Sequence, residues 1–133
     1  MKIKQISVFL ENRKGRLFDI CSMLGEAKIN IRALTIAETE TFGVLRMVVD
    51  RPEAAMELFR RHSITANQTD VVAVEVPDKP GGLAHILKIL TENAINVEYM
   101  YGFVEKFSEN ALLVFRFDDA EKAHQTLKAN GVN

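Results

Sequence analysis

The stretch ENRKGRLFDICSMLGEAKINI, residues 11–31, contains the pattern that decides the fold. A related stretch, PDKPGGLAHILKILTENAINV, follows at residues 77–97. Each begins with a polar loop that contains a glycine, continues with an apolar stripe, and ends with Ile-Asn and a further aliphatic residue. A shift of 66 positions places Gly15 on Gly81. Repetition of this kind indicates two copies of one supersecondary unit.

The repeat extends over nearly the whole chain. The alternating apolar residues before the first loop match those before the second, and beyond the hairpin region the shift becomes 68. This difference of two residues fits hairpin loops of unequal length. The pairs that show the second shift are Asp50 with Asp118, Ala55 with Ala123, Phe59 with Leu127, and Ile64 with Val132.

The periodicity of the apolar residues predicts the same elements in each copy. Alternation is typical of half-buried strands, and apolar residues at i, i+3, i+4 and i+7 indicate a helix face. We expect helices to begin at Leu17, Pro52 and Leu83, and a fourth to cover 120–129. Expected strands cover 3–10, 30–38, 42–49, 64–70, 71–77, 96–104 and 111–117, with hairpin turns at 39–42 and 105–110.

The order βαββαβ in each copy predicts an α+β protein. It should contain two tandem ferredoxin-like units, with antiparallel sheets and the helices on one face. We expect the first domain at residues 1–70 and the second at residues 71–133. The fourth strand of the second copy should begin near Gly131. We therefore interpret this C-terminal strand as incomplete, unless another segment takes its place.

The composition excludes several classes of protein. Apolar residues make up 47% of the 133 residues, which favours a packed core, and the formal net charge of −1 argues against a nucleic-acid-binding protein. A single cysteine permits neither an intrachain disulfide nor a cysteine-based metal cluster. Because no apolar run approaches the length of a membrane span, we expect a soluble, cytoplasmic protein with no nucleic-acid or membrane partner.

The sequence shows no convincing catalytic or metal-binding constellation. The three histidines, His62, His85 and His124, lack metal-ligand spacing. Cys21 falls on an apolar helix stripe and is interpreted as a core residue. Asp118-Asp119 precedes a helix, where an aspartate is a common N-cap. We therefore predict no catalytic residue, no metal and no cofactor.

The two glycine-containing loops are the candidate binding sites. A glycine before a helix lets the backbone turn tightly, and the first helical N–H groups attract an anion. Asn12 and Asp78 could accept a hydrogen bond from an ammonium group. Asn30 and Asn96 open the second strand, which we expect beside the first strand, so they would complete a pocket suited to an α-amino acid. A side chain at Gly81, as in Gly81→Val, would then block the ligand while sparing the fold.

A purely structural interpretation of the same residues is also open. A glycine near a helix start is often only a turn residue. Asn12 and Asp78 could serve as ordinary helix caps. Local pattern alone does not separate these alternatives.

Both stretches resemble ACT domains, the small-molecule-sensing modules of amino-acid metabolism. The second copy retains the Pro80-Gly81 pair, and both copies open the second strand with Asn and an aliphatic residue. The resemblance implies amino-acid binding at interfaces between domains. Lys14 replaces the usual proline, and Asp78 replaces an amide, so the two sites differ. The ligand-binding positions it implies are Asn12, Arg13, Lys14, Gly15, Arg16, Leu17, Asn30, Ile31, Asp78, Lys79, Pro80, Gly81, Gly82, Leu83, Asn96 and Val97.

The resemblance implies a non-catalytic sensor of a free amino acid, forming a homodimer and acting on a metabolic enzyme in trans. Apolar residues such as Ile31 and Tyr99 after the asparagines favour a branched-chain or aromatic ligand. A detached regulatory subunit of an enzyme such as acetolactate synthase is the main alternative. An acylphosphatase shares the fold, but only the arginines of its signature occur in residues 11–17. The RNA-recognition fold shares the topology, but its aromatic signature is absent.

Overall fold

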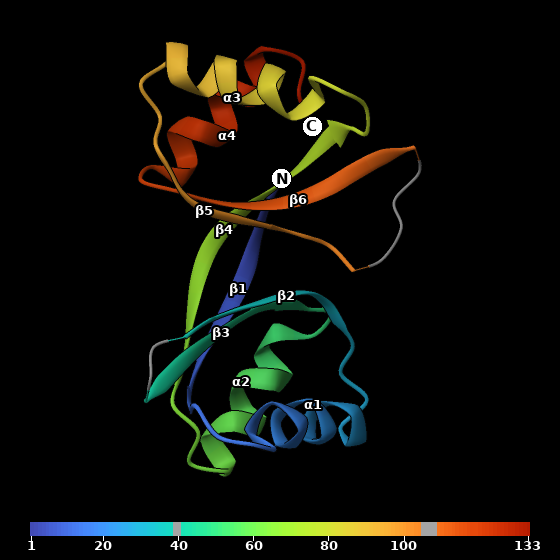
Figure 1. Cartoon of the computed structure of the whole chain (residues 1–133), viewed down its shortest axis with the longest axis vertical. Coiled ribbons are helices and arrows are strands. Elements are labelled where there is room, and N and C mark those ends of the chain that lie inside the picture. The colour runs from blue at the N-terminus through green and yellow to red at the C-terminus, as the bar shows by residue number, and fades with distance from the viewer. Residues whose placement is uncertain (39–40, 105–108) are drawn as a thin grey trace. The chain divides into compact units, whose positions relative to one another are not determined.

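The computed structural model describes residues 1–38, 41–104 and 109–133 and divides the chain into two compact units. The N-terminal unit comprises Lys4–Thr69, and the C-terminal unit comprises Met1–Ile3 together with Asp70–Asn133. The predicted α+β fold of two tandem ferredoxin-like units is confirmed (Figure 1). The expected turns at 39–42 and 105–110 lie partly outside the described residues.

The N-terminal unit contains β1 (Lys2–Glu11), α1 (Arg16–Glu26), β2 (Ile31–Glu38), β3 (Phe42–Val49) and α2 (Pro52–Arg61), and its last residues open β4 (Ala66–Pro77). Its strand order is β2-β3-β1-β4, and β3 pairs antiparallel with both β1 and β2. The expectation that the second strand lies beside the first was wrong. β3 separates them because it forms hydrogen bonds along both of its edges.

The C-terminal unit repeats this plan with α3 (Gly82–Glu92), β5 (Val97–Gly102), β6 (Asn110–Phe117) and α4 (Ala120–Ala129). Its sheet has the order β4-β6-β5. Along the other edge of β4, the Ala73 N–H donates to the Met1 carbonyl at 2.8 Å, and the Glu75 N–H donates to the Asn133 carbonyl at 2.8 Å. Met1–Ile3 therefore occupies the place of a fourth strand in this unit.

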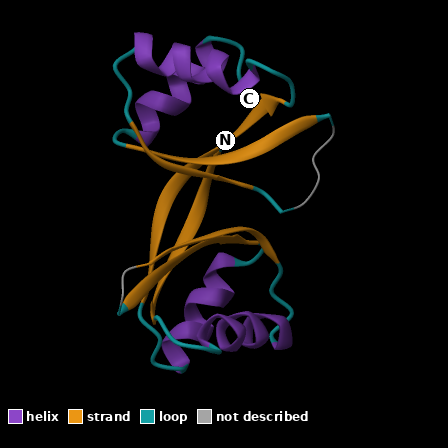
Figure 2. Ribbon diagram, in the orientation of Figure 1, coloured by secondary structure: helices purple, strands orange, loops and turns teal. Residues whose placement is uncertain are grey.

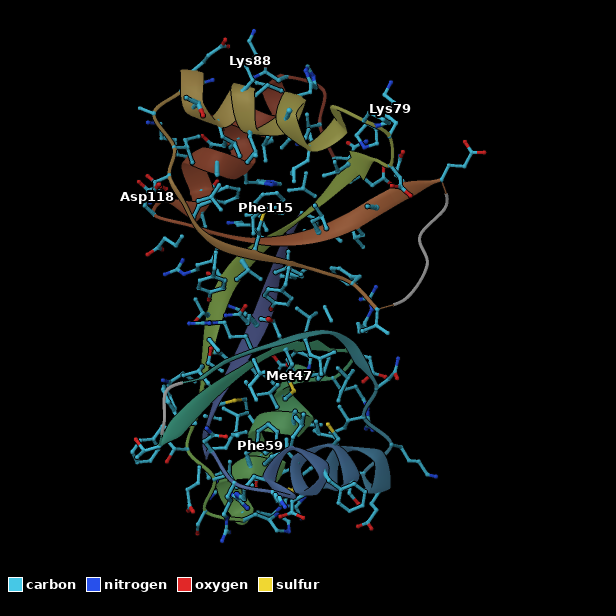
Figure 3. All side chains as sticks on the ribbon, viewed as in Figure 1. Met47, Phe59, Lys79, Lys88, Phe115 and Asp118 are labelled. Atoms are coloured by element: carbon cyan, nitrogen blue, oxygen red, sulfur yellow. The ribbon has the colours of Figure 1, made fainter. Side chains whose placement is uncertain are left out.

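In each unit, two helices cover one face of the sheet and the core lies between them (Figure 2). The helix stripe predicted from the first copy supplies Ile20 and Leu24, both fully buried against Met47 and Phe59. In the second copy Ile86 and Leu90 pack against Phe115 and Phe117 in the same way. Figure 3 labels Met47 and Phe59 in one unit and Phe115 in the other. Burying each large aliphatic or aromatic side chain contributes about 1.5–3 kcal/mol, so this layer supplies most of each unit's stability.

The first helix of each copy starts at a glycine with positive φ, whereas the second helices start in different ways. Gly15 and Gly81 are the N-cap residues of α1 and α3, with φ of 87° and 82°. Asp119 caps α4, because its side chain accepts a hydrogen bond from the Lys122 N–H at 3.0 Å. The prediction of a helix cap at Asp118-Asp119 is thus confirmed. Pro52 is the first residue of α2, as its fixed φ favours.

Candidate functional site

The loop between β1 and α1 lies at one end of the N-terminal unit, together with two other connections. The Asn12 N–H donates to the Thr41 carbonyl at 3.0 Å, and the Phe9 N–H donates to the Thr65 carbonyl at 3.1 Å. These bonds bring the β1–α1 loop, Thr41 just before β3 and the α2–β4 turn to the same end. We call this the loop end of the unit and use the same name for its counterpart in the C-terminal unit.

Backbone geometry, not side-chain capping, starts α1 and α3. The first bond of the α1 ladder runs from the Asp19 N–H to the Gly15 carbonyl at 2.9 Å, and in α3 the His85 N–H donates to the Gly81 carbonyl at 3.0 Å. Neither N-cap makes a side-chain hydrogen bond. Gly15 and Gly81, and not Asn12 and Asp78, therefore occupy the N-cap positions of these helices. Asn12 and Asp78 are exposed and lie in the loops that precede these helices, whose N-termini carry a partial positive charge.

The two glycines of PGG in the second loop have different roles. A Cβ on Gly81 would meet nothing within 4 Å, but its positive φ would strain any other residue. A Cβ on Gly82 would lie 2.1 Å from the Pro77 carbonyl oxygen. The expectation that Gly81→Val spares the fold is therefore wrong, because a β-branched residue is strongly disfavoured at positive φ. Within its own unit, Gly81 is needed for its conformation.

The asparagines that open the second strands lie at the end of each unit opposite the loop end. The Asn30 N–H donates to Asp50 Oδ1 at 3.0 Å, and the Asp50 N–H donates to the Asn30 carbonyl at 3.1 Å. Asn96 and Asp118 make the same pair at 3.2 and 3.3 Å. The 11 residues of α1 place Asn30 about 16 Å from the loop end.

The single pocket expected from these residues does not form within one unit. Lys79, in the loop before α3, and Asp118 lie at opposite ends of the C-terminal unit in Figure 3. The structure groups Asn12, Arg13, Lys14, Gly15, Arg16 and Leu17 at one loop end and Asp78, Lys79, Pro80, Gly81, Gly82 and Leu83 at the other. Asn30, Ile31, Asn96 and Val97 belong to the opposite ends. A site that combines the two sets within one unit is excluded, and a site shared between separate domains stays a prediction.

A cavity at the loop end of the N-terminal unit contains residues that sequence reasoning missed. Its volume is about 430 Å³, within the usual range for small-molecule sites. Besides Arg16, it is lined by polar His62, Ser63 and Thr65 from the α2–β4 turn. The βαββαβ topology could have indicated them. In a βαββαβ unit the fourth strand begins at the end where the first strand stops, so its turn adjoins the β1–α1 loop.

Arg16 is the most unusual charged group of this cavity. Its Nη1 lies 3.7 Å from Asp19 Oδ2, and its side chain is only 24% exposed. Its Nε is buried and has no hydrogen-bond partner within the described residues. A buried donor without a partner costs about 1–3 kcal/mol. The neighbouring Arg13 is different, since it is exposed and pairs with Glu11 at 3.4 Å.

The other sequence candidates do not assemble into a reactive centre. The Cys21 side chain is partly buried, and this burial raises the pKa of its thiol, which lowers the thiolate fraction. No group of three or more histidine, cysteine, aspartate or glutamate side chains suited to a metal ion occurs in the part of the chain that the structure describes. Over the same residues, no helix is long and apolar enough to cross a membrane.

The chain belongs to the ACT domain pair family, whose model matches residues 1–133. It is similar to protein BT0572 from Bacteroides thetaiotaomicron, with 37% sequence identity, a TM-score of 0.94, and coverage of 100% of this chain and 91% of that chain.

Two further solved structures show the same fold at lower identity. The ligand-free regulatory subunit of aspartate kinase from Thermus thermophilus is 16% identical with a TM-score of 0.66, covering 95% of this chain and 91% of that one. The subunit from Thermus flavus is also 16% identical, with a TM-score of 0.63, covering 95% and 90%. No curated protein matches the sequence.

Proposed function

We propose that this ACT domain pair is a non-catalytic regulatory protein that binds a free amino acid. The observation that carries the proposal is the pair of loops whose glycines cap α1 and α3, because each loop places an exposed polar residue before the positive N-terminus of a helix. The amides suit a carboxylate, and Asn12 or Asp78 suits an ammonium group. The carboxylate of Asp78 attracts an ammonium group more strongly than Asn12 does, so we expect the two loops to differ in affinity.

The proposed site is completed by a second copy of the chain. The loop residues and the asparagines at Asn30 and Asn96 lie at opposite ends of their units, so one unit cannot use both. A homodimer would place the strand opening of one domain beside the loop of another. Ligand binding would then order two chains at once, which gives the differential affinity that regulation requires. Exposed Leu17 and Phe18 in the first turn of α1 supply apolar surface for this contact.

The proposal includes action on a metabolic enzyme in trans. Structural relatives include regulatory subunits of aspartate kinase, which supports a regulatory role. A detached regulatory subunit of a biosynthetic enzyme such as acetolactate synthase is the alternative, and it differs by requiring its enzyme partner before a ligand binds. The ligand we favour is branched-chain or aromatic, given the apolar residues of β2 and β5.

Thermal melting against the twenty amino acids at millimolar concentration tests the proposal. A ligand present at a hundred times its Kd stabilises the folded state by about 2.7 kcal/mol, which raises Tm by several degrees. We expect one or two amino acids to do so, and Asn12→Ala or Asp78→Ala to reduce the shift. Lys122→Ala, an exposed change on α4, serves as the control and should keep it. No shift with any amino acid would contradict the proposal.

A further inference from the structure

The cavity at the loop end of the N-terminal unit is lined by one arginine and by several apolar side chains. Its polar lining is Arg16, His62 and Ser63, and its apolar lining includes Phe9, Met23 and Phe42. Phe9 and Phe42 are 45% and 61% exposed, which is unusual for phenylalanine side chains. Its volume of about 430 Å³ admits a small organic molecule.

The hydrogen-bonding groups of the cavity point to an anion. The buried Nε of Arg16 has no acceptor among the described residues, and the 3.7 Å separation of its Nη1 from Asp19 is too long for a hydrogen bond. His62 Nδ1 donates to the Leu58 carbonyl, 2.9 Å away, so Nε2 is the ring nitrogen left for other partners. Glu11 also lines the cavity, but its carboxylate pairs with Arg13.

The equivalent cavity of the C-terminal unit lacks the cation. It has a volume of about 270 Å³ and is lined by Glu75, His85, Asn110 and Asn130. Gly82 stands at the position of Arg16, and Asn110 Nδ2 donates to Glu75 Oε2 at 3.4 Å. The repeat therefore keeps the cavity but not its charge. The fold does not require an arginine at this position, because the C-terminal unit has the same fold without one.

A larger cavity beside α2 is a weaker candidate. Its volume is about 530 Å³, and its lining includes Glu53, Glu57 and Arg60. Arg60 already donates to both oxygens of Glu57, through Nε at 3.0 Å and through Nη2. Because the Arg60 guanidinium is already paired, it has few donors left for an anion. The carboxylates of Glu53 and Glu57 would also repel an anion.

We propose that the N-terminal unit binds a carboxylate-bearing small molecule in the Arg16 cavity, with its carboxylate on the guanidinium and its apolar part against Phe9, Met23 and Phe42. Guanidinium and carboxylate match as a two-pronged pair. That the molecule is an amino acid rests on the proposed function. In this cavity, the requirement for a carboxylate rests on Arg16.

Isothermal titration of the full chain tests the proposal with three matched panels. These are the amino acids, the corresponding 2-oxo acids, and amino alcohols in which the carboxylate is replaced by a neutral hydroxymethyl group. We expect binding by carboxylates but not by amino alcohols. Arg16→Met should weaken binding about tenfold or more, since a hydrogen bond to a charged group is lost. Arg60→Met removes an exposed arginine of the same unit and should bind as the wild type does.

The outcomes separate this proposal from the proposed function. Amino acids that bind equally well to Arg16→Met would overturn the Arg16 site while the sensor function stands. Binding of 2-oxo acids alone, lost in Arg16→Met, would support the Arg16 site and contradict amino-acid sensing. Weakening in Arg60→Met would move the anion to the α2 cavity and overturn the proposal. Failure of every carboxylate to bind would overturn both.

A second measurement covers the case in which Arg16→Met unfolds. Ligand-induced NMR shifts of the wild-type chain should include the His62 ring proton and the Met23 methyl group. Shifts confined to the strand openings near Asn30 and Asn96 would overturn the proposal. Arg16→Lys keeps the charge but not the two-pronged geometry, and should bind with intermediate affinity.

Discussion

The N-terminal and C-terminal units share one scaffold and differ at the positions that meet the cavity. Both begin their first helix at a glycine with positive φ, and both hold the start of their second strand by two hydrogen bonds between an asparagine and an aspartate. At the next position one unit has Arg16 and the other has Gly82. The two units therefore share their backbone conformation at the loop end, whereas the side chains at this end differ.

The largest effect on stability is expected from placing a side chain at Gly82. In Gly82→Ala the new Cβ would lie 2.1 Å from the Pro77 carbonyl oxygen, so the backbone must move. Such overpacking costs typically about 1–3 kcal/mol, and we expect the upper part of this range in the free energy of unfolding measured with urea.

Gly25→Ala is the matched control for this change. A Cβ on Gly25 would meet nothing within 4 Å, and alanine favours a helix over glycine by about 0.5–1 kcal/mol. This variant should therefore be slightly more stable than the wild type. Equal stability of Gly82→Ala and Gly25→Ala would show that position 82 does not require glycine, which contradicts the comparison.

The sequence predicted the scaffold well because each element has a local cause. Stripes such as Ile20–Leu24, the proline at position 52 and the aspartates before α4 act within a few residues. The sequence did not predict that β4 is a single strand. Residues 64–70 were interpreted as the last strand of the first copy, and residues 71–77 as the first strand of the second. Pairing of Met1–Ile3 with β4 was missed for a related reason, since partners 72 positions apart leave no periodic signal.

The candidate site was only partly predictable. Loop positions follow from the glycines, so Gly15 and Gly81 were placed correctly at the helix starts. The cavity depends on three connections that meet at one end of a unit, and only the topology reveals this meeting. His62 and Ser63 carry no motif, and Arg16 looked like one of several loop cations. Burial of its Nε, which distinguishes it from Arg13, is a tertiary property.

An intermediate effect on stability is expected from exchanging serine and glycine between the turns that follow α2 and α4. Ser63 has φ of 56° and its counterpart Gly131 has φ of 76°, so the N-terminal unit holds a serine in the left-handed region. This conformation costs a non-glycine residue about 1–2 kcal/mol, offset in part by the greater flexibility of glycine in the unfolded chain. Ser63→Gly should therefore raise the free energy of unfolding by about 0.5–1 kcal/mol, measured without ligand, and Gly131→Ser should lower it similarly.

The serine would then be retained at a cost to stability, which fits its place in the cavity of the N-terminal unit. The same titrations that test Arg16 can be repeated with Ser63→Gly. If both Ser63→Gly and Gly131→Ser lower the free energy of unfolding, the two turns differ in the residues around them as well. That result would contradict the comparison of the two units.

The smallest effect concerns an ion pair that only the C-terminal unit has. Lys2 Nζ pairs with Glu121 Oε2, while the corresponding positions of the N-terminal unit are Gln68 and Glu53. The hydrogen bond from Lys2 lowers the pKa of Glu121 below its ordinary 4.5. A carboxyl whose pKa is lowered in the folded state contributes stability above its unfolded pKa and loses it as pH falls through the folded value. Glu121→Gln should thus show a slightly shallower loss of stability below about pH 4.5.

Because both side chains of this pair are about half exposed, its global contribution is small, and a local measurement is sharper. The pair holds the start of β1 on α4, next to the bond from the Ala73 N–H to the Met1 carbonyl. Amide exchange at Ala73 should therefore be faster in Glu121→Gln at neutral pH. Glu57→Gln removes a carboxylate whose pKa is also lowered, by Arg60 on the same helix, and should leave Ala73 unchanged. Equal exchange in the two variants would mean that backbone pairing alone holds Met1–Ile3 in the place of the fourth strand.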